Sequence, residues 1–250
     1  MKKRLPYLFI AIVSICATLL TVRGCSYYGS VDEQTPYPCS QHHDDTLRLI
    51  IIGDSWAFMH QPYDNRLARL IQEKTGRPTS VRSFGICGYT SKDFYLATMN
   101  DERLKAFLTD GADYCLISLG INDTYKKTGA DLYATNTAYL LHFLLHNHIK
   151  PILMEIPDYD IDYAYQHQTP FKKALRQLSM RITDSQMDCR SAYRQALQER
   201  LRKDSLTHQI LLVPSQNWNM DLYQPDRMHL NEKGYAALDS CIANLPFIIF

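Results

Sequence analysis

The chain has 250 residues, of which 46% are hydrophobic, so it is long enough to bury one core and its composition does not require a second. Lysine and arginine number 27 and aspartate and glutamate 26, which gives a formal net charge of +1. These charges are spread along the sequence, so no basic surface of the kind that binds nucleic acid is expected. We therefore predict a single domain without a nucleic-acid partner.

The N-terminus has the order of a targeting segment. Lys2, Lys3 and Arg4 precede an apolar run from Leu5 to Val22 that contains no charged residue. This order is typical of a secretory signal peptide or a membrane anchor. The run is at the short limit for spanning a bilayer, so its length does not separate these alternatives. We predict a signal peptide or membrane tether over residues 1–25, and an exported protein that is periplasmic, membrane-anchored or secreted.

Two further features precede the predicted domain. Residues 22–25, Val-Arg-Gly-Cys, resemble a bacterial lipobox, in which the cysteine is lipidated, although Arg23 departs from that pattern. A lipoprotein is therefore a secondary alternative. Residues 26–45 contain glycine, proline, serine and aspartate without periodicity, which is typical of a linker. The predicted folded domain covers residues 46–250.

The seven cysteines do not form a metal-binding pattern. Outside the N-terminal segment their number is odd, and they show neither a Cys-x-x-Cys pair nor zinc-finger spacing, so no metal site is predicted. An exported protein can form disulfides, and Cys189 with Cys241 is one candidate pair. Cys87 and Cys115 are predicted to be buried as small apolar residues near strand ends.

Alternating strands and helices predict the fold class. Leu47–Gly53 lacks polar alternation after Arg48, as a parallel strand covered on both faces does. Further strands are predicted over residues 79–84, 113–119, 148–156 and 210–214. Helices are predicted over residues 65–74, 91–99, 103–109, 131–146, 171–183 and 185–203, with Ser91 as an N-cap and a last helix after Asn231 that ends near Ile242. Five such alternations favour a doubly wound parallel sheet under helices.

Polar residues follow the first three predicted strands. Ser55 comes after the first strand, Gly88 after the second and Asn122 after the third. Ligands of open α/β sheets bind outside the carboxyl ends of the strands, so these three residues are expected to share a site. The tract 159–168, which holds three tyrosines, is predicted to be a loop beside the substrate or an ordinary surface loop.

Asp226 and His229 follow the last strand and complete an acyl-transfer site. A serine hydroxyl needs an adjacent base, and His229 is the candidate for Ser55. Asp226 lies close enough in sequence to His229 to fix its imidazole tautomer. The backbone N–H groups of Ser55 and Gly88 and the side-chain amide of Asn122 are the predicted donors to an oxyanion.

Four blocks of the sequence resemble those of the SGNH (GDSL-like) hydrolases in order and spacing. They are Gly53-Asp54-Ser55, Gly88, Gly120-Ile121-Asn122-Asp123 and Asp226-Arg227-Met228-His229. The resemblance implies a flavodoxin-like three-layer α/β/α sandwich, here with a five-stranded parallel sheet, and an esterase without metal or organic cofactor. It also implies Ser55 as nucleophile, Gly88 and Asn122 as oxyanion donors, His229 as base and Asp226 as its partner.

Neighbours of these blocks are expected to have supporting roles. Asp54 and Asp123 are predicted to hold turns, and Trp56 to line or support the pocket. Trp56 stands where the GDSL name has leucine, and Ser83 stands where many members have asparagine. His60 is expected at the surface, without an assigned role.

The predicted function is that of a serine esterase acting on short-chain, acetyl esters of a small molecule or a glycan. The short acyl group is expected because no long apolar lid segment follows the N-terminal run. Two alternatives remain, an O-acyltransferase that uses the same site and a non-catalytic glycan-binding surface protein. An ordinary α/β-hydrolase is disfavoured, because Ser55 follows the first strand and Asp226 nearly adjoins His229.

Overall fold

The computed structural model describes residues 13–15, 18, 27–214 and 218–247. Contacts divide the chain into two units, Met1–Asp32 and Glu33–Phe250. The lipobox-like residues 22–25, and most of the predicted signal or anchor, lie outside the described residues. Within the described ranges, no helix is both long and apolar enough to cross a bilayer.

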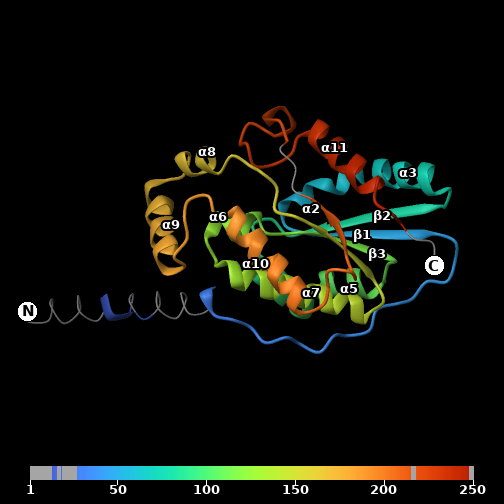
Figure 1. Ribbon diagram of the computed structural model, residues 1–250, viewed down its shortest axis with the longest axis horizontal. Coiled ribbons are helices and arrows are strands. Elements are labelled where there is room, and N and C mark those ends of the chain that lie inside the picture. Colours follow the sequence, from blue (N-terminus) through green and yellow to red (C-terminus); the bar gives the residue numbers. More distant parts are fainter. Residues whose placement is uncertain (1–12, 16–17, 19–26, 215–217, 248–250) are drawn as a thin grey trace, which may run out of the picture. The chain divides into compact units, whose positions relative to one another are not determined.

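Five parallel strands form one sheet in the second unit (Figure 1). The strands are β1 (Leu47–Gly53), β2 (Thr79–Gly85), β3 (Tyr114–Ser118), β4 (Lys150–Met154) and β5 (Leu211–Val213). Their order is β2-β1-β3-β4-β5, and every neighbouring pair is parallel. The prediction of an α/β fold with a five-stranded parallel sheet is confirmed. The carboxyl ends of all five strands therefore lie along one edge.

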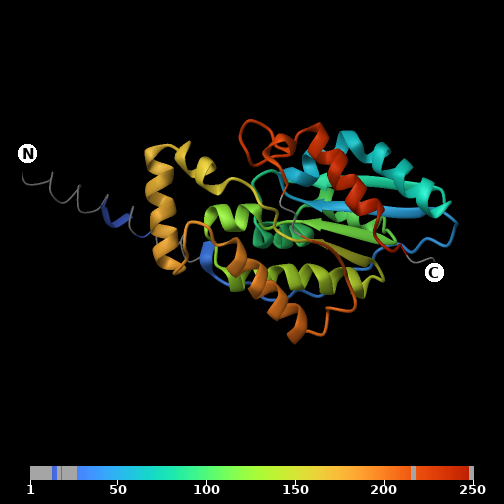
Figure 2. The same ribbon diagram turned by 45° about the horizontal axis from the view of Figure 1, so that its top comes forward.

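Helices cover both faces of this sheet (Figures 1 and 2). One layer contains α2 (Ser55–His60), α3 (Asp64–Thr75) and α11 (Glu232–Ala243). The other contains α4 (Ser91–Asn100), α5 (Glu102–Thr109), α7 (Ala130–His146) and α10 (Arg190–Lys203). Three more helices follow strand ends, namely α6 (Ile121–Lys126), α8 (Ile161–Gln166) and α9 (Pro170–Ile182), and short 3-10 turns span Gln61–Tyr63 and Met220–Leu222.

The core explains why β1 is apolar without alternation. Leu49 and Ile51 pack in one cluster with Leu67 and Ile71 of α3. Ile50 points to the opposite face because successive side chains of a strand alternate, and it is equally buried, at 1% exposed. Both faces of β1 are thus removed from water, as its sequence predicted.

Residues 33–45, predicted to be part of a linker, belong to the second unit and are hydrogen-bonded to its folded part. The Ser40 N–H donates to the Thr109 carbonyl oxygen at 2.8 Å, and the Cys39 N–H donates to Asn147 Oδ1 at 2.7 Å. These single hydrogen bonds hold an extended segment to the domain without any repeating pattern. The sequence consequently carries no periodic signal for it.

One predicted N-cap, one predicted helix start and one predicted loop are wrong. Thr90 rather than Ser91 caps α4, because Thr90 Oγ1 accepts from the Asp93 N–H and the Asp93 carboxylate accepts from the Thr90 N–H. The helix predicted from residue 185 begins at Arg190. The tract 159–168 is not all loop, since it contains α8, whose N-cap Asp160 accepts a hydrogen bond from the Tyr163 N–H.

Three further predictions about side chains are also wrong. No disulfide joins Cys189 and Cys241. Cys189 is the N-cap of α10 and Cys241 lies in α11, and these helices cover opposite faces of the sheet (Figure 1). Cys87 is exposed, whereas Cys115 is buried as predicted. His60 was expected at the surface but is only 1% exposed, because it is held between Asp64 and the buried Asp239.

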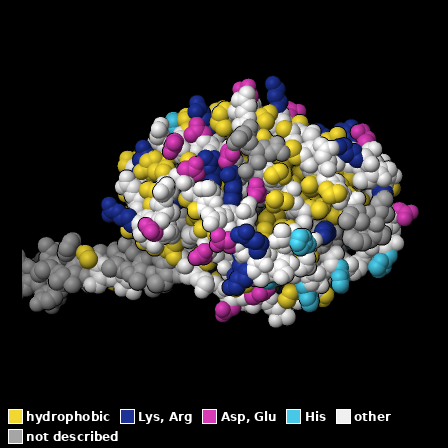
Figure 3. Space-filling model, viewed as in Figure 1, with side chains coloured by type: hydrophobic (Ala, Val, Ile, Leu, Met, Phe, Trp, Pro, Cys, Tyr) yellow, Lys and Arg dark blue, Asp and Glu magenta, His cyan; other side chains and the backbone are white. Residues whose placement is uncertain are grey.

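Positive and negative side chains are intermixed on the face shown in Figure 3. Lysine and arginine side chains lie among aspartate and glutamate side chains there. Mixed signs at short spacing leave little net potential to attract a polyanion to that face.

Candidate active site

Ser55 begins α2 at the carboxyl end of β1. Asp54 is the N-cap of this helix, and its Oδ1 accepts a hydrogen bond from the Trp56 N–H at 3.0 Å. Gly53 is needed where the chain turns, because a Cβ there would lie 2.0 Å from the Ser118 carbonyl oxygen on β3. Ser55 lines a cavity of about 640 Å³, here called the catalytic cavity.

The loop that carries His229 is fixed against α2. Tyr223 and Leu230 form an antiparallel bridge at the two ends of this loop. The indole N–H of Trp56 donates to the Met228 carbonyl oxygen at 3.1 Å. Trp56 is 1% exposed and therefore supports the loop from the core rather than lining the cavity.

Ser55, His229 and Asp226 form a continuous chain of hydrogen bonds. Ser55 Oγ lies 2.8 Å from His229 Nε2, and His229 Nδ1 lies 2.6 Å from Asp226 Oδ2. Because Nδ1 faces a carboxylate, it carries the proton and leaves Nε2 to accept from the serine hydroxyl. This arrangement suits a hydroxyl nucleophile activated by an oriented base.

The Asp226 carboxylate is held in its ionised form. Burial would raise its pKa, but hydrogen bonds from the His229 side chain and from the backbone N–H groups of His229 and Met228 outweigh burial, so the pKa is lowered. Both backbone bonds are 3.0 Å long and reach Asp226 Oδ1. A fixed negative charge beside Nδ1 stabilises the imidazolium that forms when His229 takes a proton.

Three candidate donors border the same cavity. Gly88 has a φ of +80°, and no atom lies within 4 Å of the place a Cβ would take, so its backbone faces open space. The Ser55 N–H is in the first turn of α2, where N–H groups have no acceptor within the helix. Asn122 lines the cavity and gives one amide hydrogen to Asp54 Oδ2 at 3.0 Å, which leaves its second hydrogen for a ligand.

Two buried aspartates hold the strand ends together. Burial raises the pKa of Asp54 to about 7, although the Trp56 N–H and the Asn122 amide both donate to it. Burial raises the pKa of Asp123 to about 6, and this carboxylate accepts from Ser91 N and Oγ at 2.9 and 2.7 Å. Neither carboxylate lines the catalytic cavity. Asp54 links Asn122 of α6 to the first turn of α2, and Asp123 links α6 to the first residue of α4.

Sequence reasoning missed several residues that border the site. Lys126 Nζ donates to the Gly88 carbonyl oxygen. Its spacing of four residues from Asn122 places both on one face of α6, which is the signal that would have found it. The remaining cavity wall comes from Met59, Cys87, Tyr125, Tyr163, Ala164, His167, Pro225 and Met228. Tyr163, Ala164 and His167 were not missed in the same way, because they belong to the tract 159–168, which one of the two interpretations placed beside the substrate.

The described residues contain no group of three or more His, Cys, Asp or Glu side chains placed to hold a metal ion.

The sequence profile of the GDSL-like Lipase/Acylhydrolase family matches residues 51–237. The chain belongs to this family. The matched range includes all four blocks that resemble the SGNH hydrolases, and it extends from β1 to α11. As a GDSL-like acylhydrolase, the protein is a carboxylic ester hydrolase. Comparison with curated proteins found no match to the sequence.

Solved structures of GDSL-like and related hydrolases share the fold. A lipase/acylhydrolase from Enterococcus faecalis is 17% identical, with a TM-score of 0.53 over 79% of this chain and 93% of that one. The acetylxylan esterase Axe2 from Geobacillus stearothermophilus is 18% identical, with a TM-score of 0.55 over 81% and 96%. The acetyl xylan esterase AlAXEase is 19% identical, with a TM-score of 0.54 over 78% and 98%.

Proposed function

We propose that this GDSL-like hydrolase is a serine esterase that removes short acyl groups, acetyl above all, through an acyl-enzyme on Ser55. The observation that carries the proposal is the hydrogen-bonded chain from Ser55 Oγ through His229 to Asp226, with steps of 2.8 and 2.6 Å. A nucleophile, its base and the group that orients the base are thus within hydrogen-bond reach of one another.

The proposed reaction has two halves. His229 Nε2 takes the hydroxyl proton of Ser55 while Oγ bonds to the ester carbonyl carbon, and the carbonyl oxygen becomes an anion. The Ser55 and Gly88 N–H groups and the Asn122 amide donate to that anion. The alcohol then leaves with the proton from His229. Water attacks the acyl-enzyme, gives one proton to His229, and the acid departs as Ser55 regains its hydrogen.

The catalytic cavity has its own apolar wall, but the exposed apolar surface of α9 does not extend it. Exposed apolar side chains do gather on α9, but none of them lines this cavity. They are Phe171, Leu175, Leu178 and Ile182. Each methylene that is buried contributes about 0.8 kcal/mol, so chain length raises the rate only where an apolar wall receives the extra carbons. Two structurally similar proteins are acetyl xylan esterases, and on this likeness we expect acetate esters to react faster than octanoate esters.

We propose a carbohydrate ester as the natural substrate class. Two of the structurally similar proteins are acetyl xylan esterases. The catalytic cavity also presents Tyr125 and Tyr163 beside polar groups, and aromatic walls with a few polar groups are common in ligand sites. An O-acyltransferase would use the same residues with a sugar hydroxyl in place of water.

The proposed function is tested by acetate release from acetylated polysaccharides and from p-nitrophenyl acetate, butyrate and octanoate, with Ser55→Ala as the blank. We expect acetate release from wild type only, and covalent labelling of wild type but not Ser55→Ala by a fluorophosphonate probe. Faster turnover of the octanoate ester contradicts the short-acyl proposal. Transfer of acetyl to an added oligosaccharide, at a rate above hydrolysis, indicates the acyltransferase instead.

We also propose that the protein is exported through residues 1–25. The support is sequence order, since Lys2-Lys3-Arg4 precede the apolar run. Cell fractionation tests the location, and the intact mass of the isolated protein separates a cleaved peptide from a retained tether. Recovery of the full-length chain in the cytosol alone contradicts export.

A further inference from the structure

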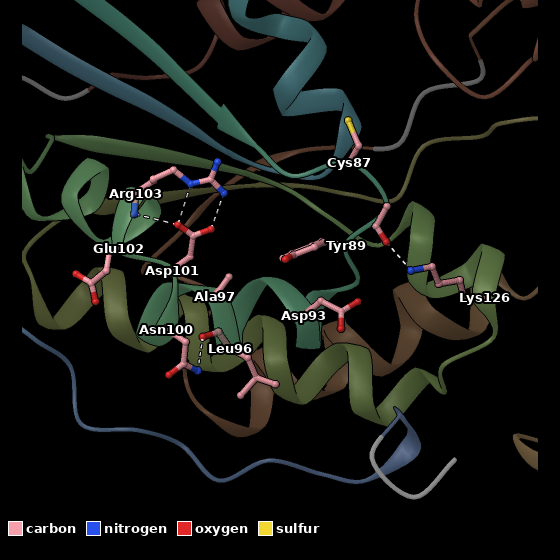
Figure 4. A pocket seen from close by; sticks show the side chains of 11 residues that line it. Cys87, Tyr89, Asp93, Leu96, Ala97, Asn100, Asp101, Glu102, Arg103 and Lys126 are labelled. Atoms are coloured by element: carbon pink, nitrogen blue, oxygen red, sulfur yellow. Dashed lines mark hydrogen bonds and ion pairs between the residues drawn. The ribbon is translucent and has the colours of Figure 1, made fainter. Parts of the chain in front are cut away.

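A second hollow opens beside the catalytic cavity, between the loop after β2, the outer face of α4 and the start of α5 (Figure 4). We call it the Tyr89 groove. Its volume is about 970 Å³, and Cys87 and Gly88 line both hollows. Volumes of about 300–1,000 Å³ are usual for small-molecule sites. A molecule that fills this groove therefore lies next to Gly88, at the proposed reaction centre.

The lining of the Tyr89 groove is polar and of mixed charge. Tyr89 extends into the middle of the hollow, with Asp93 and Lys126 toward one end and Asn100, Glu102 and Arg103 toward the other (Figure 4). Carboxylate and amide oxygens accept hydrogen bonds from hydroxyl groups, and ammonium and guanidinium groups donate to them. Both signs of charge are present, so an anion is not favoured over a neutral ligand.

Several of these groups are held in place by the protein. Asp101 accepts from the Arg103 N–H at 2.9 Å and pairs with the Arg103 guanidinium at 2.8 Å. The Tyr89 N–H donates to the Ile86 carbonyl oxygen at 3.2 Å, so this side chain is carried on the same turn as Gly88. Groups fixed before binding lose less conformational entropy when a ligand arrives.

We propose that the Tyr89 groove binds the sugar portion of a carbohydrate ester, which is the alcohol released from Ser55. The acyl group occupies the catalytic cavity, and neighbouring sugar units extend past Gly88 over Tyr89. A polyhydroxylated neutral ligand matches the mixed donors and acceptors, whereas the apolar part of the lining is limited to Cys87, Leu96, Ala97 and the Tyr89 ring. This inference rests on the proposed esterase function.

The test compares acetylated xylo-oligosaccharides with p-nitrophenyl acetate, whose small alcohol does not extend along the groove. The quantity compared is the ratio of kcat/KM for the oligosaccharide to kcat/KM for p-nitrophenyl acetate. We expect Tyr89→Ala and Glu102→Ala each to lower this ratio about tenfold, by raising KM for the oligosaccharide. Tyr89→Phe keeps the ring and is expected to retain more of that ratio. Glu199→Ala, an exposed glutamate of α10, is the matched control and should leave the ratio unchanged.

Binding provides a second readout that does not need catalysis. Ser55→Ala should bind unacetylated xylotetraose in a calorimetric titration, and adding Tyr89→Ala should weaken that binding. An unchanged ratio in both groove variants, or no binding to Ser55→Ala, overturns the inference even if p-nitrophenyl acetate is hydrolysed. If neither ester is hydrolysed by wild type while xylotetraose binds through Tyr89, the esterase function fails and the sugar site stands.

Discussion

The side-chain amide of Asn122 donates a hydrogen bond to the buried carboxylate of Asp54 at 3.0 Å. This bond ties a proposed oxyanion donor to the residue before the proposed nucleophile. The other Asp54 oxygen accepts from the Trp56 N–H at 3.0 Å. Both oxygens of Asp54 are therefore in use as acceptors.

Asp54→Asn is expected to displace Asn122. The oxygen of the new amide can still accept from the Trp56 N–H. Its NH₂ group then faces the NH₂ group of Asn122, and two donors repel. Small displacements of catalytic groups cost up to about a hundredfold, so we expect kcat for p-nitrophenyl acetate to fall between about tenfold and a hundredfold. Asp113→Asn, where a carboxylate also accepts a backbone N–H but at the opposite end of β3, should keep kcat. Equal kcat in both variants would show that the Asp54 bond does not position Asn122.

Loss of the proposed nucleophile or base should abolish turnover. Ser55→Ala and His229→Ala are each expected to lower kcat/KM by at least about 10⁴-fold, and the double variant should be no worse than either, because the two residues act as one unit. Steady-state kinetics with p-nitrophenyl acetate measure this. His208→Ala, an exposed histidine on the loop after α10, is the control and should retain wild-type rates. Additive losses in the double variant would argue against a shared proton transfer.

The proposed Asn122 donor acts on the transition state more than on the bound ester. We expect Asn122→Ala to lower kcat by about 10² to 10³-fold with little change in KM, because the charge that it stabilises develops only during attack. Asn244→Ala, near the end of the described chain, should have no such effect. A rise in KM at constant kcat would instead assign Asn122 to ground-state binding.

His60 should make stability depend on pH. Its ring lies 2.7 Å from Asp239 and 2.9 Å from Asp64. Burial lowers the His60 pKa, but the hydrogen bonds that the ring donates to these carboxylates, and the carboxylate charges, outweigh it, so the pKa is raised. The native state thus holds the proton more tightly than the unfolded state. The stabilisation is complete below the unfolded histidine pKa of about 6.5 and is lost as pH rises through the folded value.

Urea unfolding of wild type and His60→Ala at pH 6 and pH 9 tests this linkage. The variant leaves the buried Asp239 with Arg66 alone, and we expect its free energy of unfolding at pH 6 to fall by roughly 3 kcal/mol. The difference between wild type and variant should shrink at pH 9. Comparing the two proteins cancels the contributions of Asp54 and Asp123, whose raised pKa values also make stability fall with rising pH. A difference that does not change with pH would refute the role of His60.

The sheet was predictable because its signal is local. Leu47–Gly53 is apolar on both faces, and only a strand between two helical layers needs that pattern. The turn after β1 was also predictable, since Gly53 permits close approach to β3 and Asp54 can cap a helix. These local features are sufficient to predict that Ser55 lies at a strand end.

The failures share a physical cause, which is dependence on partners distant in sequence. His60 has no nearby signal of burial, because Asp239 lies 179 residues later in the chain. Cys87 lies in the turn after β2 and was expected to be buried, but it is exposed and lines the catalytic cavity. The tract 159–168 does border the cavity, as one interpretation expected, but its helix α8 was not predicted.

The groups of the proposed site are far apart in the order of synthesis. His229 is made 174 residues after Ser55, with α11 following it, and Tyr235 secures α11 by donating to the Trp56 carbonyl oxygen at 3.1 Å. A growing polypeptide therefore carries its hydroxyl and both backbone donors long before it has an imidazole. In the proposed mechanism the chain has no base during that interval, and it becomes reactive only when the His229 loop and α11 dock.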